Sequence, residues 1–311
     1  MKAVRFHEFG SSEVLRYENV DRPVPGAGQV LVRMAATSFN PVDDHIRAGA
    51  LAEMIPIELP YVPGIDLAGT VEELGAGVTG FQAGDQVVAM LPLDSAGGAA
   101  EYVAVPAESL APAPRTIALA DAAALPLTGL AAWQTAFELA EVKSGQSVLV
   151  NGAGGGVGSL VVQLAVDAGA KVTAVDGEQH GERLRGYGAH QVFGPLELAA
   201  GPAAVGGPFD VVVNHVRVSP DELAQLTSYV ADSGVAVSTA GPVPEDPARG
   251  VRSANLFVRP DGTQLAELVG KVDAGTVRIH VAAHRLVADL AAVHADAGAG
   301  RLPGKTVVLA P

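Results

Sequence analysis

The sequence predicts an α/β protein made of a β-rich domain and a doubly wound parallel-sheet domain. Its 311 residues suit two domains with substantial cores. Short runs of β-branched residues, separated by Gly and Pro turn signals, fill residues 1–118. From residue 147 onward, strand and helix patterns alternate. Such alternation is typical of a parallel sheet covered by helices on both faces.

The composition narrows the class of protein. Apolar residues make up 49% of the chain and charged residues 17%, which indicates an ordered globular protein. The net charge of −14 argues against binding to nucleic acid or to anionic lipid, because like charges repel. Cysteine is absent, which excludes disulfides, thiolate nucleophiles and every zinc site built on sulfur.

We expect a cytoplasmic protein that does not span a membrane. The opening MKAVRFHEFG lacks the apolar stretch of a signal peptide. The most apolar segment, 116–133, is interrupted by Asp121 and Pro126 and is too short for a membrane span.

The sequence pattern of the first half predicts strands, and these are followed by a predicted helix. The strand candidates are 29–37, 69–75 and 85–91, and the turn signals are PGAG (25–28) and FQAGD (81–85). Residues 121–141 then carry the spacing of a helix.

The second half predicts the parallel sheet and its crossover helices. The expected strands are 147–152, 171–175, 209–214 and 234–239, and the expected helices are 157–168, 179–187 and 220–231. Ser219 and Glu222 are expected to form a capping box at the start of the helix at 220–231. Residues 194–208 are too weakly patterned to assign. After a loop at 241–250 come a strand-like 253–260, a helix near 262–274 and a strand at 306–310.

The strongest motif is the glycine-rich stretch NGAGGGVG, which lies between a predicted strand and a predicted helix. Glycines at such a turn let backbone N–H groups approach a pyrophosphate, and the helix N-terminus adds a favourable dipole. The alternative is an ordinary Gly-rich turn, but its place inside a βαβ unit favours a dinucleotide. The expected cofactor-binding residues are Asn151, Gly152, Gly154, Gly155, Gly156, Val157 and Gly158.

An acid at the end of the next strand bears on the choice of cofactor. Asp176, followed by Gly177, lies 176 − 158 = 18 residues beyond the last glycine, close to the spacing of an acid that binds ribose hydroxyls. A carboxylate there repels a 2′-phosphate, so NADH is favoured over NADPH. A surface role for Asp176 is the alternative, and His180, Arg183 or Arg185 can also fold back toward a phosphate.

The chain resembles the zinc-independent quinone oxidoreductases, the zeta-crystallin-like branch of the medium-chain dehydrogenase/reductase superfamily. The likeness runs through FNPVDDHIRAG (39–49), PGIDLAGTVEELGAGVTGFQAGDQV (63–87), AALPLTGLAAW (123–133), GAGGGVG (152–158) and GKTVVL (304–309). It implies a GroES-like catalytic domain from 1–120 and 253–311 and a Rossmann NAD(P)-binding domain from 121–252. It also implies a homodimer or tetramer, often joined through the last Rossmann strand, here 251–258.

The resemblance also implies an enzyme without zinc. Zinc-dependent relatives hold the metal with Cys and a His in a GHE motif, where this chain has Gly64-Ile65-Asp66. Without a Lewis acid, hydride addition to a quinone or an α,β-unsaturated carbonyl is favoured, because conjugation spreads the developing charge. The expected function is therefore hydride transfer from NAD(P)H to such an acceptor. The alternatives are a dedicated enoyl or tailoring reductase of one biosynthetic intermediate, and a non-catalytic NAD(P)H-binding protein.

Two residues are candidates for the catalytic centre by resemblance. Asn40 matches an Asn that relatives place near the nicotinamide, although a turn role before Pro41 is the alternative. His45 stands where many relatives carry a Tyr, and it can donate a proton or be a simple rim histidine. Asp43 and Arg47 flank it and are expected to form a structural ion pair.

The remaining cofactor candidates also come from matched segments. Thr128 can bind the nicotinamide carboxamide, or its hydroxyl can bond within its own helix. Asn214 ends a Rossmann strand where the dinucleotide is expected to pass. Which of its atoms contact the dinucleotide is left open, because the sequence departs from the family pattern there. The other candidates are Thr239, Gly241, Phe257 and Val258. For Phe257 and Val258, apolar packing explains the residue equally well.

Overall fold

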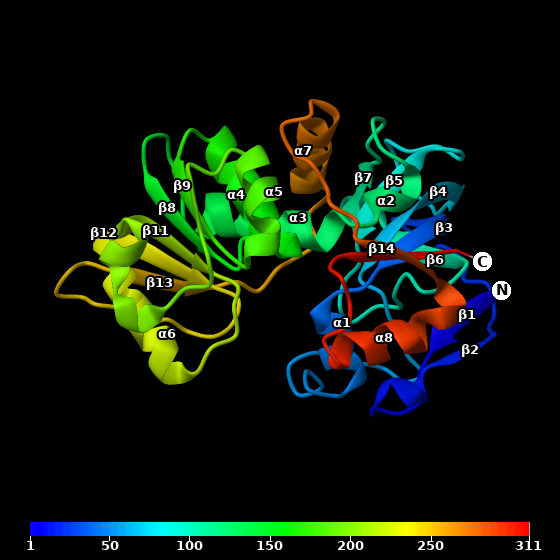
Figure 1. Cartoon of the computed structure of the whole chain (residues 1–311). Coiled ribbons are helices and arrows are strands. Elements are labelled where there is room, and N and C mark those ends of the chain that lie inside the picture. The colour runs from blue at the N-terminus through cyan, green and yellow to red at the C-terminus, as the bar shows by residue number, and fades with distance from the viewer. Residues whose placement is uncertain (311) are drawn as a thin grey trace. The chain divides into compact units, whose positions relative to one another are not determined.

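The computed structural model describes residues 1–310, and the chain divides into two units (Figure 1). Unit 1 consists of Met1–Leu130 and the chain from Arg259 onward, and unit 2 is the continuous stretch Ala131–Val258. Unit 1 is therefore assembled from both ends of the chain. Within residues 1–310, no helix combines the length and the apolar character that crossing a membrane requires.

Unit 1 is built on a mostly antiparallel sheet. Strands β1 (Lys2–Arg5) and β2 (Arg16–Asn19) form a separate antiparallel pair. The main sheet has the order β14 (Ala283–Leu286), β15 (Thr306–Leu309), β3 (Gln29–Ser38), β4 (Asp66–Leu74), β5 (Gln86–Met90) and β7 (Leu110–Pro112), and β6 (Tyr102–Pro106) also pairs with β3. The pairing of β15 with β3 is the point at which the two ends of the chain meet.

The helices of unit 1 are α1 (Pro41–Arg47), α2 (Leu119–Ala122), α7 (Gly262–Asp273) and α8 (Leu290–Gly298). Helix α3 (Pro126–Trp133) contains the division between the units, which falls after Leu130. Helix α1 begins directly after β3, with Pro41 at a position where a missing N–H costs nothing. The backbone N–H of Asn40, its N-cap, donates to Asp43 Oδ2 at 2.9 Å.

Unit 2 is a parallel sheet with the doubly wound strand order. The order is β10 (Gln191–Phe193), β9 (Lys171–Val175), β8 (Ser147–Asn151), β11 (Phe209–Asn214), β12 (Val230–Ser238) and β13 (Arg252–Asn255). All neighbouring pairs are parallel. The chain reverses its direction of winding between β8 and β11, the point where ligands bind in such sheets. The predicted α/β fold class is confirmed.

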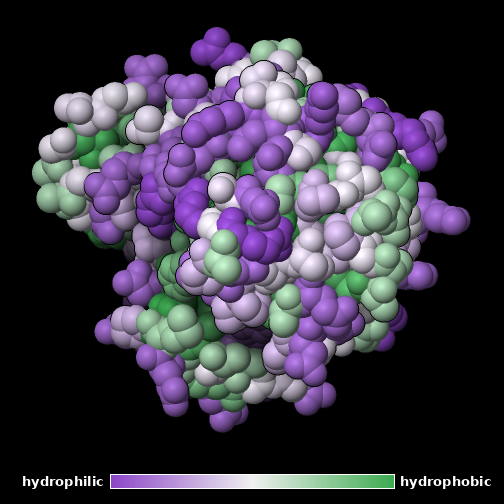
Figure 2. Space-filling view, turned by 90° about the vertical axis from the view of Figure 1, so that its left-hand side faces the viewer, coloured by the Kyte–Doolittle hydropathy of each residue, from purple (hydrophilic) through white to green (hydrophobic). Residues whose placement is uncertain are grey.

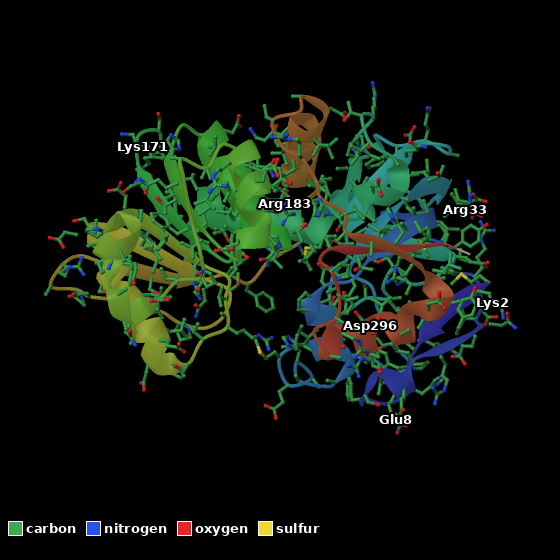
Figure 3. The ribbon with its side chains drawn as sticks, in the orientation of Figure 1. Lys2, Glu8, Arg33, Lys171, Arg183 and Asp296 are labelled. Atoms are coloured by element: carbon green, nitrogen blue, oxygen red, sulfur yellow. The ribbon has the colours of Figure 1, made fainter. Side chains whose placement is uncertain are left out.

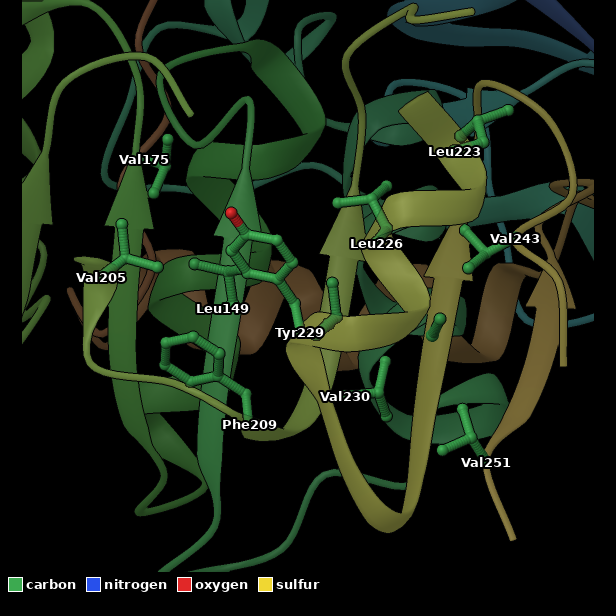
Figure 4. Packing of buried hydrophobic residues seen from close by; sticks show 12 residues of the cluster. Leu149, Val175, Val205, Phe209, Leu223, Leu226, Tyr229, Val230, Val243 and Val251 are labelled. Atoms are coloured by element: carbon green, nitrogen blue, oxygen red, sulfur yellow. The ribbon is translucent and has the colours of Figure 1, made fainter. Parts of the chain in front are cut away.

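Helices α4 (Gly156–Asp167) and α6 (Pro220–Leu226) lie on opposite sides of this sheet (Figure 1), and α5 (Gly181–Gly186) follows β9. The α6 side holds a cluster of buried residues that includes Leu149, Leu226 and Tyr229 (Figure 4). The unassigned connection at 194–208 carries two short 3-10 turns, Leu198–Ala200 and Pro202–Val205, in place of a full crossover helix. Its Leu196 and Leu198 pack against the same cluster.

Several observed bounds differ from those predicted. The helix expected at 220–231 ends at Leu226, because a 3-10 turn follows and β12 starts at Val230. The strand expected at 253–260 ends at Asn255. The expected domain boundaries fell after 120 and after 252, whereas the units divide after Leu130 and Val258. The second difference arises because β13 pairs in register with β12 and so belongs to the sheet of unit 2.

Candidate functional site

The glycine loop of unit 2 has three positions, Gly152, Gly154 and Gly158, that disfavour any side chain. Gly152 has a φ of +83°, which favours glycine. A Cβ on Gly158 would lie 2.2 Å from the backbone oxygen of Gly152, and one on Gly154 would lie 2.0 Å from His180 Nδ1. Gly155 is the N-cap of α4, a helix of 12 residues that starts at Gly156. The geometry suits a pyrophosphate held by backbone N–H groups at a helix N-terminus.

A cavity of about 600 Å³ lies beside this loop, at the carboxyl ends of β8 and β9. Of the expected cofactor residues, Asn151, Gly152, Asp176 and Gly177 line it. The remaining polar lining is Glu197, Glu222 and Gln225, and the apolar lining is Val175, Pro195, Leu196, Leu198, Ala199, Val216 and Val218. Apolar walls with a few polar groups are typical of a site for a small molecule or cofactor.

Asp176 is held by the loop that it borders. Its Oδ2 accepts a bond from the N–H of Gly154 at 2.6 Å, and its Oδ1 accepts one from the N–H of Gly177 at 2.7 Å. His180 Nδ1 lies 2.8 Å from the same Oδ1. Arg183, which projects from α5 (Figure 3), donates to the backbone oxygen of Gly154 at 2.8 Å. The carboxylate therefore faces the cavity in a fixed orientation, and both basic residues brace the loop.

Asn214 has an internal role. Its Oδ1 accepts a bond from Asn151 Nδ2 at 2.9 Å, and its own Nδ2 donates to the backbone oxygen of Val216 at 3.0 Å. The side chain is 1% exposed. These bonds tie the carboxyl ends of β8 and β11 together, so Asn214 supports the loop from beneath.

His215 and Thr239 form a second polar pair close to Gly152. Thr239 is exposed, and its hydroxyl lies 3.1 Å from His215 Nδ1. A Cβ on Gly152 would lie 3.3 Å from the Cβ of His215, so the histidine borders the turn. Burial lowers the pKa of His215 to about 4, because desolvation disfavours the charged imidazole.

We expect the imidazole of His215 to stay neutral down to about pH 5 in an NMR titration. Because its folded pKa of about 4 lies below the usual 6.5, its contribution to stability is complete above pH 6.5 and is lost as the pH falls toward 4. Over that range, the free energy of unfolding should therefore fall more steeply in the wild type than in His215→Gln. Protonation of His215 near pH 6.5 would contradict this expectation.

Unit 1 holds a buried ionic network that the sequence did not predict. Asp66 is completely buried, and its Oδ2 lies 3.0 Å from the ammonium of Lys305, which is only 6% exposed. Asp66 also accepts bonds from Asn40 Nδ2 at 2.7 Å, from the backbone N–H of Leu127 at 2.7 Å and from the hydroxyl of Ser38. Two features of the sequence could have indicated this network. Asp66 lies inside the apolar stretch PGIDLAG, and Lys305 precedes a buried strand.

Asn40 lies inside this network. Its Oδ1 accepts a bond from Lys305 Nζ at 2.6 Å, while its Nδ2 donates to Asp66. The cation requires the oxygen and the anion requires the amide N–H, so the orientation of the side chain is fixed. Asn40 is 2% exposed, and a role limited to the turn before Pro41 does not describe it.

Asp66 does not fit a zinc site. It stands in the Glu position of the GHE motif, but both of its oxygens are occupied by the donors described above. Among residues 1–310, no group of three or more His, Cys, Asp or Glu side chains is arranged to hold a metal ion.

The expected ion pair between Asp43 and Arg47 is wrong. Arg47 Nη2 pairs with Asp44 Oδ1 at 2.6 Å instead, because Asp43 turns back to accept bonds from the N–H groups of Asn40 and Gly64. Burial raises the pKa of Asp43 to about 6. The side-chain bond from His294 holds the pKa of Asp44 at about 2.

The other candidates are not among the residues that line the cavity of unit 2. His45 is half-buried in the last turn of α1. The Thr128 hydroxyl donates to the backbone oxygen of Ala124 at 2.7 Å, which is the intrahelical alternative. Gly241 has a φ of +138°. Val258 is half-buried, but Phe257 is 64% exposed, so apolar packing does not explain its presence.

Comparisons with known proteins agree with this architecture. Residues 26–115 match the family described as "Alcohol dehydrogenase GroES-like domain", and residues 187–308 match the family described as "Zinc-binding dehydrogenase". The structure of an alcohol dehydrogenase superfamily protein from Novosphingobium aromaticivorans superposes with a TM-score of 0.88 at 30% identity, over 99% of both chains.

Curated relatives point to one branch. A quinone oxidoreductase of Mus musculus is 39% identical over 63% of this chain, but the match spans only 59% of that protein, less than two thirds of its length. A chloroplast envelope quinone oxidoreductase homolog of Arabidopsis thaliana is 36% identical over 71% of this chain and 69% of its own. The chain belongs to the zeta-crystallin-like quinone oxidoreductases of the medium-chain dehydrogenase/reductase superfamily.

Proposed function

We propose that this protein is an NAD(P)H-dependent oxidoreductase that transfers hydride to a quinone or an α,β-unsaturated carbonyl without zinc. The observation that carries the proposal is the glycine loop of unit 2. Cβ atoms would fill it, and a cavity of about 600 Å³ adjoins it. Bound there, the reduced nicotinamide would supply the hydride, while the protein supplies orientation and charge stabilisation.

The acceptor class follows from the residues that replace the metal ligands. The chain has no cysteine, and Asp66 is engaged by Lys305 and Asn40. A conjugated acceptor needs only positioning and a few hydrogen bonds, because its developing charge is delocalised. We propose His45 as a proton donor to the reduced product and Asn40 as a residue near the nicotinamide.

The test is oxidation of NADH and NADPH by the purified protein across a panel of quinones, enals and enones. We expect turnover with at least one conjugated acceptor and none with isolated ketones. Tight binding of the cofactor without turnover, unaffected by replacement of Asn40 and His45, would favour the non-catalytic alternative.

A dedicated enoyl or tailoring reductase is the second candidate. The short connection at 194–208 and the departures at His45 and Asn214 from the family pattern favour a specialised protein. A turnover preference of several orders of magnitude for one conjugated compound over simple quinones would decide for it.

We propose NADH as the preferred cofactor. The described residues that line the cavity include three acids, Asp176, Glu197 and Glu222, and no Lys, Arg or His. A 2′-phosphate near these carboxylates would be repelled.

Replacing Asp176 by Ser together with Glu178 by Arg should raise the affinity for NADPH relative to NADH by about tenfold or more, since a repulsive charge is removed and an attractive one is added. Binding of both cofactors to the purified variant, measured by fluorescence titration, checks this. Asp176→Asn is the matched control, because it removes the charge while keeping the size and one acceptor for the loop N–H groups. An unchanged preference between NADPH and NADH in both variants would mean that Asp176 does not contact the adenosine ribose.

We also propose a homodimer formed through β13. This strand is last in the order of its sheet and pairs with β12 along one side. Sedimentation at micromolar concentration should give the mass of two chains, and a single-chain mass would contradict the proposal.

A further inference from the structure

One wall of the cavity in unit 2 is formed by a connecting segment rather than by an α-helix or a strand. Residues 195–199 form it, and they belong to the connection from β10 to β11 that carries two 3-10 turns. A short 3-10 turn has few internal bonds to hold it in place. Pro195, Glu197 and Ala199 are exposed, while Leu196 and Leu198 are half-buried against the cluster under the sheet. The position of this wall must therefore come largely from its contacts.

Tyr229 supplies such a contact from within the core. The residue is completely buried among Leu149, Phe209 and Leu226. Its hydroxyl donates to the backbone oxygen of Leu198 at 3.2 Å and lies 3.5 Å from that of Glu197. Figure 4 shows the hydroxyl pointing in the same direction as the strand arrowheads, toward the carboxyl ends where the cavity lies. Burial raises the pKa of Tyr229, so the hydroxyl remains a donor.

A phenylalanine would fill the same space in the core. The hydroxyl adds no apolar contact, and its partners are the backbone carbonyls of the wall. A buried hydroxyl is costly unless it is bonded, so this bond ties the wall to the core at a defined place.

We propose that Tyr229 is a positioning residue for the adenosine half of the dinucleotide, acting through the backbone of residues 197 and 198 that it holds. The wall and Val216 with Val218 would enclose the adenine ring, while Asp176 meets the ribose. This inference rests on the proposed function, because it assumes that the cavity takes the adenosine of NAD(P)H.

The test compares Tyr229→Phe with the wild type by equilibrium binding to the purified full-length protein. We expect affinities for NADH and for 5′-AMP to fall by about three- to tenfold, the effect of one hydrogen bond. Affinity for reduced nicotinamide mononucleotide, which lacks adenosine, should not change. The matched control is Tyr61→Phe in unit 1, which removes a buried hydroxyl that donates to the backbone oxygen of Leu93 at 3.1 Å. This control should leave all three affinities unchanged.

Hydrogen exchange supplies a second readout, which reports on the wall itself rather than on affinity. In Tyr229→Phe, the amides of 196–201 should exchange faster than in the wild type, while those of β8 and β11 keep their rates. In the wild type, 5′-AMP should slow exchange at 196–199, and nicotinamide mononucleotide should not. This measurement needs no variant and so stands if Tyr229→Phe fails to fold.

The outcomes separate the two proposals. A wild type that binds neither NADH nor 5′-AMP overturns the proposed function. A wild type that binds both, with unchanged affinities in Tyr229→Phe or unaltered exchange at 196–199 on binding 5′-AMP, overturns only the role of Tyr229.

Discussion

Replacing Lys305 by Met should lower the free energy of unfolding by about 3–5 kcal/mol, because it leaves a completely buried carboxylate without its cation. Asp66 would keep its bonds from Asn40 and Leu127, but these neutral donors do not balance a full charge. Urea unfolding at neutral pH measures the effect. We expect Asn40 to lose its fixed orientation in the same variant, since Lys305 holds its Oδ1.

Two further variants test the cause of this loss. The double variant Lys305→Met with Asp66→Asn removes both charges, so it should be more stable than Lys305→Met alone. Lys143, whose side chain is 72% exposed, provides the control, and Lys143→Met should change stability by no more than about 0.5 kcal/mol. A loss in Lys305→Met no larger than in the control would show that the pair contributes little.

Gly158→Ala should abolish most of the affinity for the dinucleotide, with a loss of about 100-fold or more. The added Cβ would lie 2.2 Å from the backbone oxygen of Gly152 and 3.0 Å from the Cα of Ala153. Neither is a flexible side-chain end, so the loop and the N-terminus of α4 must move apart. That displaces the N–H groups expected to hold the pyrophosphate. Equilibrium binding of NADH measures the effect.

Gly270→Ala is the matched control for this substitution. Gly270 lies within α7, and a Cβ there meets nothing within 4 Å. We expect that variant to bind NADH normally and to gain about 0.5–1 kcal/mol of stability, because alanine favours the helix. Wild-type affinity in Gly158→Ala would mean that the loop tolerates the displacement or that the dinucleotide binds elsewhere.

The sequence predicted those elements whose signals are local. The apolar stretch at 147–151 became a central parallel strand, as expected for a strand buried on both faces. Ser219 and Glu222 form the expected capping box, with Glu222 Oε2 accepting from Ser219 N–H at 2.8 Å. The glycine loop was recognisable because its glycines are spaced closely between a strand and a helix, and Gly158 meets the backbone of Gly152 and Ala153 in the same loop. The ends of α6 and β13 were missed, since neighbouring strands decide where these elements stop.

The long-range polar contacts were outside the reach of sequence reasoning. Lys305 and Asp66 are 239 residues apart, and no periodic pattern links them. The sequence predicted Asp43 as the partner of Arg47, but in the structure Arg47 pairs with Asp44. Asp43 lies at the start of the helix, where its carboxylate accepts a bond from the backbone N–H of Asn40. Asn214 was expected near the cofactor on the strength of its place at a strand end, and only the neighbouring Asn151 shows why it turns inward.

The two-ended construction of unit 1 bears on the order in which the chain folds during synthesis. Unit 2 is one continuous stretch and is complete once Val258 has left the ribosome. Unit 1 needs β15, which pairs with β3 across nearly the whole chain, and Lys305, which neutralises Asp66. Domains usually fold from the N-terminus onward, but here the domain that starts first must finish last. Until β15 and Lys305 have emerged, Ala36–Ser38 at the end of β3 lack their partner strand and Asp66 lacks its cation.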